Sequence, residues 1–190
     1  IVYAILYMYS SSLYPGGSQA NVASVGYDWV HNYWCDLMND TAGNGQPNPA
    51  SPYAVPALII LCLSIMMVFV NFGTGFAIGK IWKRIIQIGG VLAMTSACLI
   101  FTPLHNSMIG LASFFGLFVA VGIIKEIYQS DMTFYKISGI ICVLLLALNN
   151  YIYYSRNLIE TLPLLQKVTI GLVILWLAGL HFRIRQQPIS

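Results

Sequence analysis

The sequence predicts an all-α membrane protein, a polytopic helix bundle in a single domain that covers residues 1–190. Two observations predict this class. The chain is 58% hydrophobic and only 8% charged, whereas a soluble domain has about 25% charged residues. A soluble core of this size cannot hide so much apolar surface, so lipid must solvate most of the side chains. The second observation is a series of long apolar runs, because ~20 such residues cross a bilayer.

Five apolar runs are long enough to cross a membrane, and a shorter one begins the chain. The five are 53–76, 86–103, 106–124, 137–155 and 162–182. Residues 1–9 are equally apolar but reach only ~14 Å as a helix. We expect them to be the end of a first span whose start lies upstream of this sequence. The prediction is therefore six spans, of which the first is partial.

The basic residues predict the orientation of these spans. Seven of the nine lysines and arginines follow the second, fourth and sixth spans: Lys80, Lys83, Arg84, Lys125, Lys136, Arg183 and Arg185. Cytoplasmic loops are enriched in these residues, so we expect residues 77–85 and the C-terminus to be cytoplasmic. The loop 10–53 would then lie outside a bacterial-type inner membrane. Arg156 and Lys167 are the two exceptions.

The loop 10–53 contains the most distinctive stretch of the chain, Tyr27–Asp40 (YDWVHNYWCDLMND). In a helix, Asp28, His31 and Cys35 would share one face, because they are three and four residues apart. The tryptophans of the stretch are typical of a membrane interface. We therefore predict a short amphipathic helix that forms a lid at the membrane surface. The glycines and prolines on both sides of it predict irregular loops.

The predicted topology brings polar residues from separate segments to the outer ends of the helices. Ionisable groups at membrane depth are costly and usually face the bundle interior, so an outward-facing polar pocket is the site hypothesis. The candidate catalytic residues are Asp36, His105 and His31, because carboxyl and imidazole groups transfer protons. We expect Asp36 and His105 to lie within hydrogen-bond reach. The candidate ligand-binding residues are Cys35, Asn149, Asn150, Arg156 and Trp34.

The same residues can instead have structural roles. His105 can cap its turn, His31 can be an interface histidine, and Asn149 with Asn150 can join helices by hydrogen bonds. Neither C-x-x-C nor H-E-x-x-H is present, so we expect no cofactor and no metal. Zinc is the alternative, with His31, Asp36 and His105 as its three ligands. The scattered basic residues form no strip that would bind nucleic acid.

Two further alternatives concern the lid. Arg156 is the rival partner of Asp36, and pairing with it would make that carboxylate structural. His31 precedes Cys35 by one helical turn, so an imidazole-activated cysteine nucleophile is conceivable on spacing alone. Both alternatives depend on how the lid folds.

Two short motifs resemble a known family. Asn32–Met38 (NYWCDLM) resembles the N-x-x-S-D-L-G signature of a bacterial family of six-helix integral membrane proteins of unknown function. Cys35 stands where that family has serine, and Met38 where it has glycine. Thr102–His105 (TPLH) resembles the junction before that family's fourth span.

The overall plan of that family is distantly similar to the alkaline ceramidase and progestin-receptor superfamily of membrane hydrolases. The superfamily places serine, aspartate and three histidines around zinc. The present chain lacks the H-x-x-x-H pair of the last helix. The resemblance therefore implies a site at Asp36 and His105 rather than a complete zinc hydrolase.

The function favoured by these observations is binding of a lipid or small ligand, or an accessory role beside a larger membrane complex. The alternative is a membrane-embedded hydrolase of a lipid amide or ester, in which Asp36, His105 and His31 act on the substrate. The sequence leaves open whether the chain is an enzyme. The expected partners are the lipid bilayer and, for the accessory role, a larger membrane protein complex.

Overall fold

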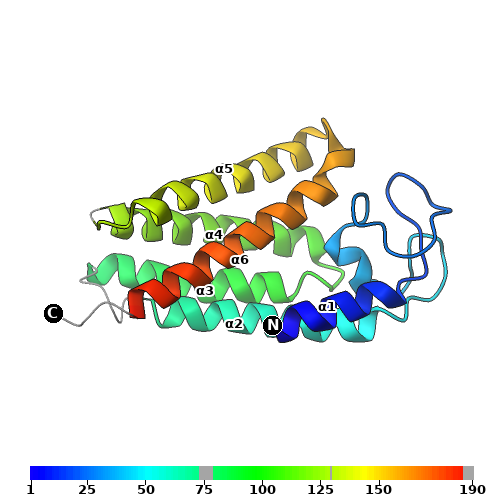
Figure 1. Ribbon diagram of the computed structural model, residues 1–190, viewed down its shortest axis with the longest axis horizontal. Helices are drawn as coiled ribbons and strands as arrows, with labels where there is room; N and C mark the ends of the chain where they lie inside the picture. The colour runs from blue at the N-terminus through cyan, green and yellow to red at the C-terminus, as the bar shows by residue number, and fades with distance from the viewer. Residues whose placement is uncertain (73–78, 129, 186–190) are drawn as a thin grey trace. The chain divides into compact units, whose positions relative to one another are not determined.

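The computed structural model describes residues 1–72, 79–128 and 130–185, and within them every regular element is a helix (Figure 1). The α-helices are α1 (Val2–Leu13), α2 (Ser51–Val70), α3 (Lys80–Cys98), α4 (His105–Tyr128), α5 (Thr133–Ser155) and α6 (Leu162–Arg185). Two short 3-10 helices complete the set: η1 (Trp34–Met38) and η2 (Ile159–Thr161). The all-helical class predicted from the sequence is confirmed.

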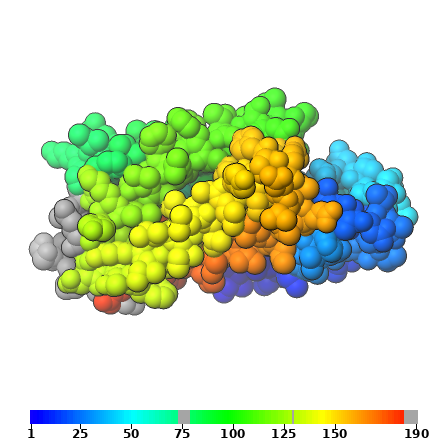
Figure 2. Space-filling model, turned by 90° about the horizontal axis from the view of Figure 1, so that it is seen from above, coloured from blue at the N-terminus to red at the C-terminus, as the bar shows by residue number. Residues whose placement is uncertain are grey.

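Four helical segments are long and apolar enough to cross a membrane. They are Ser51–Val70, His105–Tyr128, Thr133–Ser155 and Ile159–Arg183. The chain is therefore a membrane protein by the length and composition of its helices. Apolar side chains cover the outside of these helices, as on α5, which lies at the surface in yellow-green and yellow in Figure 2 and exposes Ile140, Ile141 and Leu144. Such a surface suits lipid rather than water.

The other two helices are less suited to crossing a membrane alone. Helix α1 has 12 residues, which correspond to about 18 Å. Helix α3 begins with three basic residues within its first five positions. Residues 73–76 of the predicted second span, and 77–78 of the predicted cytoplasmic loop, lie outside the described residues.

The backbone forms two compact units. Unit 1 comprises Ile1–Leu61 and Ala147–Ile170, and unit 2 comprises Cys62–Leu146 and Gly171–Ser190. Helices α2, α5 and α6 contribute residues to both. Each unit is described separately below, and the candidate site residues of the lid all belong to unit 1.

Glycines set the spacing of the helices in unit 2. A Cβ atom at Gly122 would lie 3.0 Å from Ile86, and one at Gly89 would lie 3.1 Å from Val119. Small residues allow such close backbone approach between membrane helices, so α3 and α4 pack tightly and antiparallel. At one end of this pair the Lys125 amine lies 4.5 Å above the Trp82 ring.

Helices α5 and α6 are joined in unit 2 by two hydrogen bonds at one contact. The Trp176 Nε1–H donates to the Tyr135 carbonyl at 2.9 Å, and the Tyr135 hydroxyl donates to the Gly179 carbonyl at 3.1 Å. Trp176 also covers Gly139, where a Cβ atom would approach the ring to 2.7 Å. The buried core of unit 2 surrounds these contacts: Phe69, Phe72, Ile86, Val119, Ile123, Ile127, Met132, Cys142, Trp176, Leu177 and Leu180.

Candidate functional site

The loop between α1 and α2 is closed at its base by glycines. Gly17 has φ +86°, and a Cβ atom there would lie 2.2 Å from the Asn44 nitrogen and 2.2 Å from the Gly43 carbonyl carbon. Only glycine fits both this backbone conformation and this close approach. The Tyr14 hydroxyl accepts a hydrogen bond from the Gly43 N–H at 2.9 Å and donates one to the Gly17 carbonyl at 3.3 Å. The two ends of the loop are thus held against each other.

The predicted amphipathic helix over 27–40 takes a different form in the structure. Asp28 Oδ1 accepts hydrogen bonds from the N–H groups of Val30 at 2.9 Å and His31 at 3.2 Å. A side chain that bonds nearby backbone groups competes with helix formation, and here it produces a turn. The chain is extended at Tyr33 and then forms the five-residue helix η1.

Helix η1 begins with a capping interaction. Asp36 Oδ2 accepts the Tyr33 N–H at 2.8 Å, which satisfies a backbone donor at the start of the helix. The same oxygen accepts the Asn32 amide at 3.0 Å. Asp36, which we predict as a catalytic residue, therefore has a structural task in the lid.

Asn32 lies at the centre of the lid and is only 1% exposed. Its amide nitrogen donates to the Gly17 carbonyl at 2.8 Å as well as to Asp36. Its amide oxygen accepts the Asp28 N–H at 2.9 Å. One side chain thus joins the glycine turn, the Asp28 turn and η1, because a buried amide must satisfy its polar atoms.

Asn48 joins several segments by side-chain hydrogen bonds in the same way, at the point where the loop leads into α2. Its amide nitrogen donates to the carbonyls of Leu37 at 3.2 Å and Asn39 at 2.8 Å, and its oxygen accepts the Ala50 N–H at 3.1 Å. The buried Ser10 hydroxyl donates to the Ala50 carbonyl at 3.0 Å. Helix α1, η1 and the start of α2 are therefore held together.

His31 pairs with Asp28 through its side chain. Its Nδ1 lies 2.8 Å from Asp28 Oδ2, and both side chains are about one-third exposed. Partial burial tends to raise the pKa of Asp28, but the hydrogen bonds from His31 and from the Val30 and His31 N–H groups outweigh it and lower that pKa. The carboxylate is thus held charged beside the ring, as an orienting carboxylate is beside a general base.

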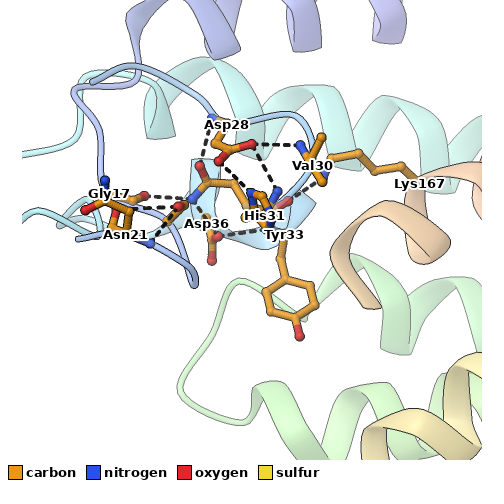
Figure 3. Close-up of polar contacts among 10 residues, drawn as sticks. Gly17, Asn21, Asp28, Val30, His31, Tyr33, Asp36 and Lys167 are labelled. Atoms are coloured by element: carbon orange, nitrogen blue, oxygen red, sulfur yellow. Dashed lines mark hydrogen bonds and ion pairs between the residues drawn. The ribbon is translucent and has the colours of Figure 1, made fainter. Parts of the chain in front are cut away.

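Lys167 reaches this cluster from α6. Its ammonium donates to the Asn32 carbonyl and to the Pro163 carbonyl, the second at 3.3 Å, and it lies 5.4 Å from the Tyr27 ring centroid. Figure 3 shows the side chain extending from α6 towards the turn that carries Asp28 and His31. Asp36 and Asp28 are the charged groups of opposite sign that act on this amine. A cation near the start of α6 therefore meets the lid.

An aromatic cluster packs between α1 and the lid. The Trp34 ring lies 5.8 Å from that of Tyr3 and 5.0 Å from that of Tyr7, and Tyr27 lies 5.0 Å from Trp29. The Tyr27 hydroxyl donates to the Tyr33 carbonyl at 3.0 Å. Burial is the main cause that raises the pKa of the Tyr27 phenol, so this hydroxyl keeps its proton.

The Trp34 indole, like the Ser24 hydroxyl of the same loop, carries a buried polar atom without a hydrogen-bond partner among the described residues. Its Nε1–H is buried and has no hydrogen-bond acceptor in the described part of the chain. In the same unit the buried Gln166 Oε1 also has no donor among those residues. Buried polar atoms without partners are uncommon in native structures and require an explanation, such as water or a ligand.

Cys35 is unsuited to nucleophilic chemistry. Burial is the largest cause that raises the pKa of its thiol, followed by the neighbouring Asp36 charge, and the value is about 12. A thiol acts as a nucleophile only when it is deprotonated. The sequence alternative in which His31 activates Cys35 is therefore disfavoured, and His31 is instead paired with Asp28.

The remaining predicted residues are distributed over both units. Asn149 donates to Thr169 Oγ1 at 2.8 Å, and the Arg156 guanidinium lies 5.1 Å from the Tyr153 ring centroid. The Asn149 contact fits the alternative in which this residue joins helices, and Asn150 follows it on α5. His105, at the start of α4 in unit 2, contacts Asn106 at 3.3 Å. Its proximity to Asp36, in unit 1, stays a prediction.

The structure adds residues that the sequence prediction did not select. Lys167 is the clearest case, and its signal was its position as one of two basic residues that break the predicted charge asymmetry. Asn32 and Asn48 carried no such signal. Among the described residues, no three His, Cys, Asp or Glu side chains are grouped so that they could hold a metal ion.

The chain was compared with protein-family models, with curated proteins and with solved structures, and no match was found in any of the three.

Proposed function

We propose that unit 1 binds the headgroup of a membrane lipid. The observation that carries the proposal is the buried Trp34 N–H, which has no acceptor among the described residues. A lipid headgroup offers phosphate and ester oxygens, which are acceptors that would satisfy this donor. Trp and Tyr side chains are favoured at the level of lipid headgroups, and the cluster around Trp34 supplies several of them.

Lys167 supports the same ligand chemistry. An ammonium has three N–H donors, and two of them are used by the Asn32 and Pro163 carbonyls. Within the described part of the chain the third has no acceptor, so it can bind one from a ligand. An anionic oxygen near this amine would form a charge-assisted hydrogen bond, which is stronger than a neutral one.

The proposal also places unit 1 at the outer surface of the membrane. We take the four apolar helical segments, together with α1 and α3, as six spans. The excess of lysine and arginine at one end of these spans supports a cytoplasmic location for residues 77–85 and an external one for 10–53. Lipids of the outer leaflet would then reach the lid.

The orientation predicts the accessibility of two positions in intact cells. Val25, which is 95% exposed in the loop, is replaced by cysteine in one variant, and Lys83 in the other. A membrane-impermeant maleimide should label Val25→Cys from outside. It should label Lys83→Cys only after the membrane has been permeabilised. The reverse labelling pattern would show that the orientation is the opposite one. Labelling of both variants from outside would contradict the proposed topology.

The substitution Trp34→Phe tests the binding site. It removes the indole N–H and keeps an aromatic ring, so we expect the affinity for dioleoyl phosphatidylglycerol to fall by roughly tenfold or more, as for a lost hydrogen bond to a charged group. Affinity is measured on the full chain in detergent, from the rise of its unfolding temperature with lipid concentration.

Trp29→Phe is the matched control, because Trp29 belongs to the same cluster but is 43% exposed. It should leave the affinity unchanged. Equal affinities of the wild type and Trp34→Phe would refute the site. Inorganic phosphate serves as a second probe, and binding of phosphate as tight as that of the lipid would show that the acyl chains contribute nothing.

The hydrolase alternative is favoured by one observation, the contact of 2.8 Å between His31 and Asp28. An imidazole held in this way can serve as a general base towards water. Release of fatty acid from the same lipid samples would therefore be measured in parallel. Release that His31→Gln abolishes would replace binding by hydrolysis as the function, whereas intact lipid in every sample would leave binding as the function.

A further inference from the structure

Two of the four cysteines of the chain meet inside unit 2. Cys62 lies on α2 and is 3% exposed, and Cys98 is the half-buried last residue of α3. Their side chains lie within hydrogen-bonding reach of each other. The described residues form no disulfide at these positions, and both cysteines are free thiols.

The register of the two helices supports this contact independently. The Gln87 amide donates to the Val70 carbonyl at 2.6 Å, and a Cβ atom at Gly90 would lie 2.5 Å from Phe69. Residue numbers therefore increase along α3 in the direction in which they decrease along α2, so the two helices are antiparallel. Cys98 follows Gly90 by eight residues and Cys62 precedes Phe69 by seven, which is about two helical turns in each case. The antiparallel pairing thus brings the two cysteines level.

We propose that Cys62 and Cys98 form a dithiol site that reacts with low-molecular-weight disulfides. Cys98 is the more exposed of the two and ends its helix, so its thiolate attacks one sulfur of the disulfide. One thiol leaves with its electron pair and takes up a proton, and a mixed disulfide forms on Cys98. Burial disfavours the Cys62 thiolate as it does that of Cys35, but the mixed disulfide on Cys98 lies beside it. The Cys62 thiol loses its proton, attacks this neighbouring sulfur and expels the second thiol.

Atoms and electrons balance in this exchange. One small disulfide is reduced to two thiols, and two protein thiols are oxidised to one disulfide. The product links α2 to the end of α3. The opposite exchange with an excess of small dithiol restores the two thiols, so the site is reversible.

The experiment uses glutathione disulfide and the full chain in detergent. After incubation, free thiols are blocked and counted by mass spectrometry of the denatured protein. The wild type should lose two of its four thiols, and peptide mapping should find Cys62 linked to Cys98. Dithiothreitol should restore all four. A wild type that keeps four free thiols, or a linkage between other cysteines, would overturn the proposal.

Three variants separate the roles of the thiols. Cys142→Ser is the matched control, because Cys142 is also a buried cysteine of unit 2, and it should still form the linkage. Cys62→Ser should stop at a glutathione adduct on Cys98. Cys98→Ser should form neither linkage nor adduct on Cys62, and an adduct on Cys62 at the rate seen for Cys98 would contradict the order of attack. The mapping of the wild type needs no variant, so the test holds even if a variant misfolds.

Discussion

Replacing Gly17 by alanine should open the loop between α1 and α2. The residue has φ +86°, and the added Cβ atom would lie 2.2 Å from two backbone atoms of the opposite loop segment. The backbone strain costs about 1 kcal/mol, and overpacking against backbone adds about 1–3 kcal/mol. We expect a loss of about 2–4 kcal/mol of local stability, which corresponds to roughly a 30-fold or greater rise in loop opening.

Limited proteolysis of the loop measures this opening. Gly45→Ala is the matched control, because Gly45 has a similar φ of +82° but no heavy atom within 4 Å of its Cβ position. The control should lose only the stability that the backbone strain costs, about 1 kcal/mol. Equal cleavage rates for the two variants would show that the close approach of Gly17 to Gly43 does not stabilise the loop.

Replacing Asn32 by leucine should have an effect of similar size for a different reason. The volume is nearly kept, but the Gly17 carbonyl, the Asp36 carboxylate and the Asp28 N–H each lose a partner. Leaving buried polar groups unsatisfied costs about 1–3 kcal/mol each, and relaxation lowers the sum. We expect the lid to lose about 3 kcal/mol of stability, measured by hydrogen exchange of the backbone amides of η1.

Asn21→Leu is the control for this substitution. Asn21 is exposed, and its side chain accepts one hydrogen bond, from the Ala23 N–H at 2.9 Å. The exchange rates in η1 should therefore change little. If Asn32→Leu leaves those rates unchanged as well, Asn32 is not the centre of the lid.

The helical class followed from properties that depend little on detailed contacts. Long apolar runs between charged connections predict membrane helices because each backbone group bonds within its own helix. Four of the predicted runs correspond to helical segments able to cross a membrane. Helix α1 is too short to be judged in this way, and α3 carries three basic residues near its start.

The lid was harder to predict because its conformation depends on individual hydrogen bonds. The spacing of Asp28, His31 and Cys35 fits a helical face, yet the Asp28 carboxylate binds backbone N–H groups and forms a turn instead. Sequence spacing did place His31 beside Asp28, and the two side chains pair, although in a turn rather than on a helical face. The role of Lys167 depends on a contact between distant segments, which periodicity cannot reveal.

The bond between Lys167 and the Asn32 carbonyl joins residues that are 135 positions apart, and this separation imposes an order of assembly. Ribosomes add about 5–20 residues per second, so the lid sequence leaves the ribosome roughly 7–27 s before its anchor on α6 is complete. During that interval the lid has its own asparagine and glycine contacts but not the lysine. Whatever contacts the lid has during that interval, its attachment to α6 forms only after α6 has been synthesised.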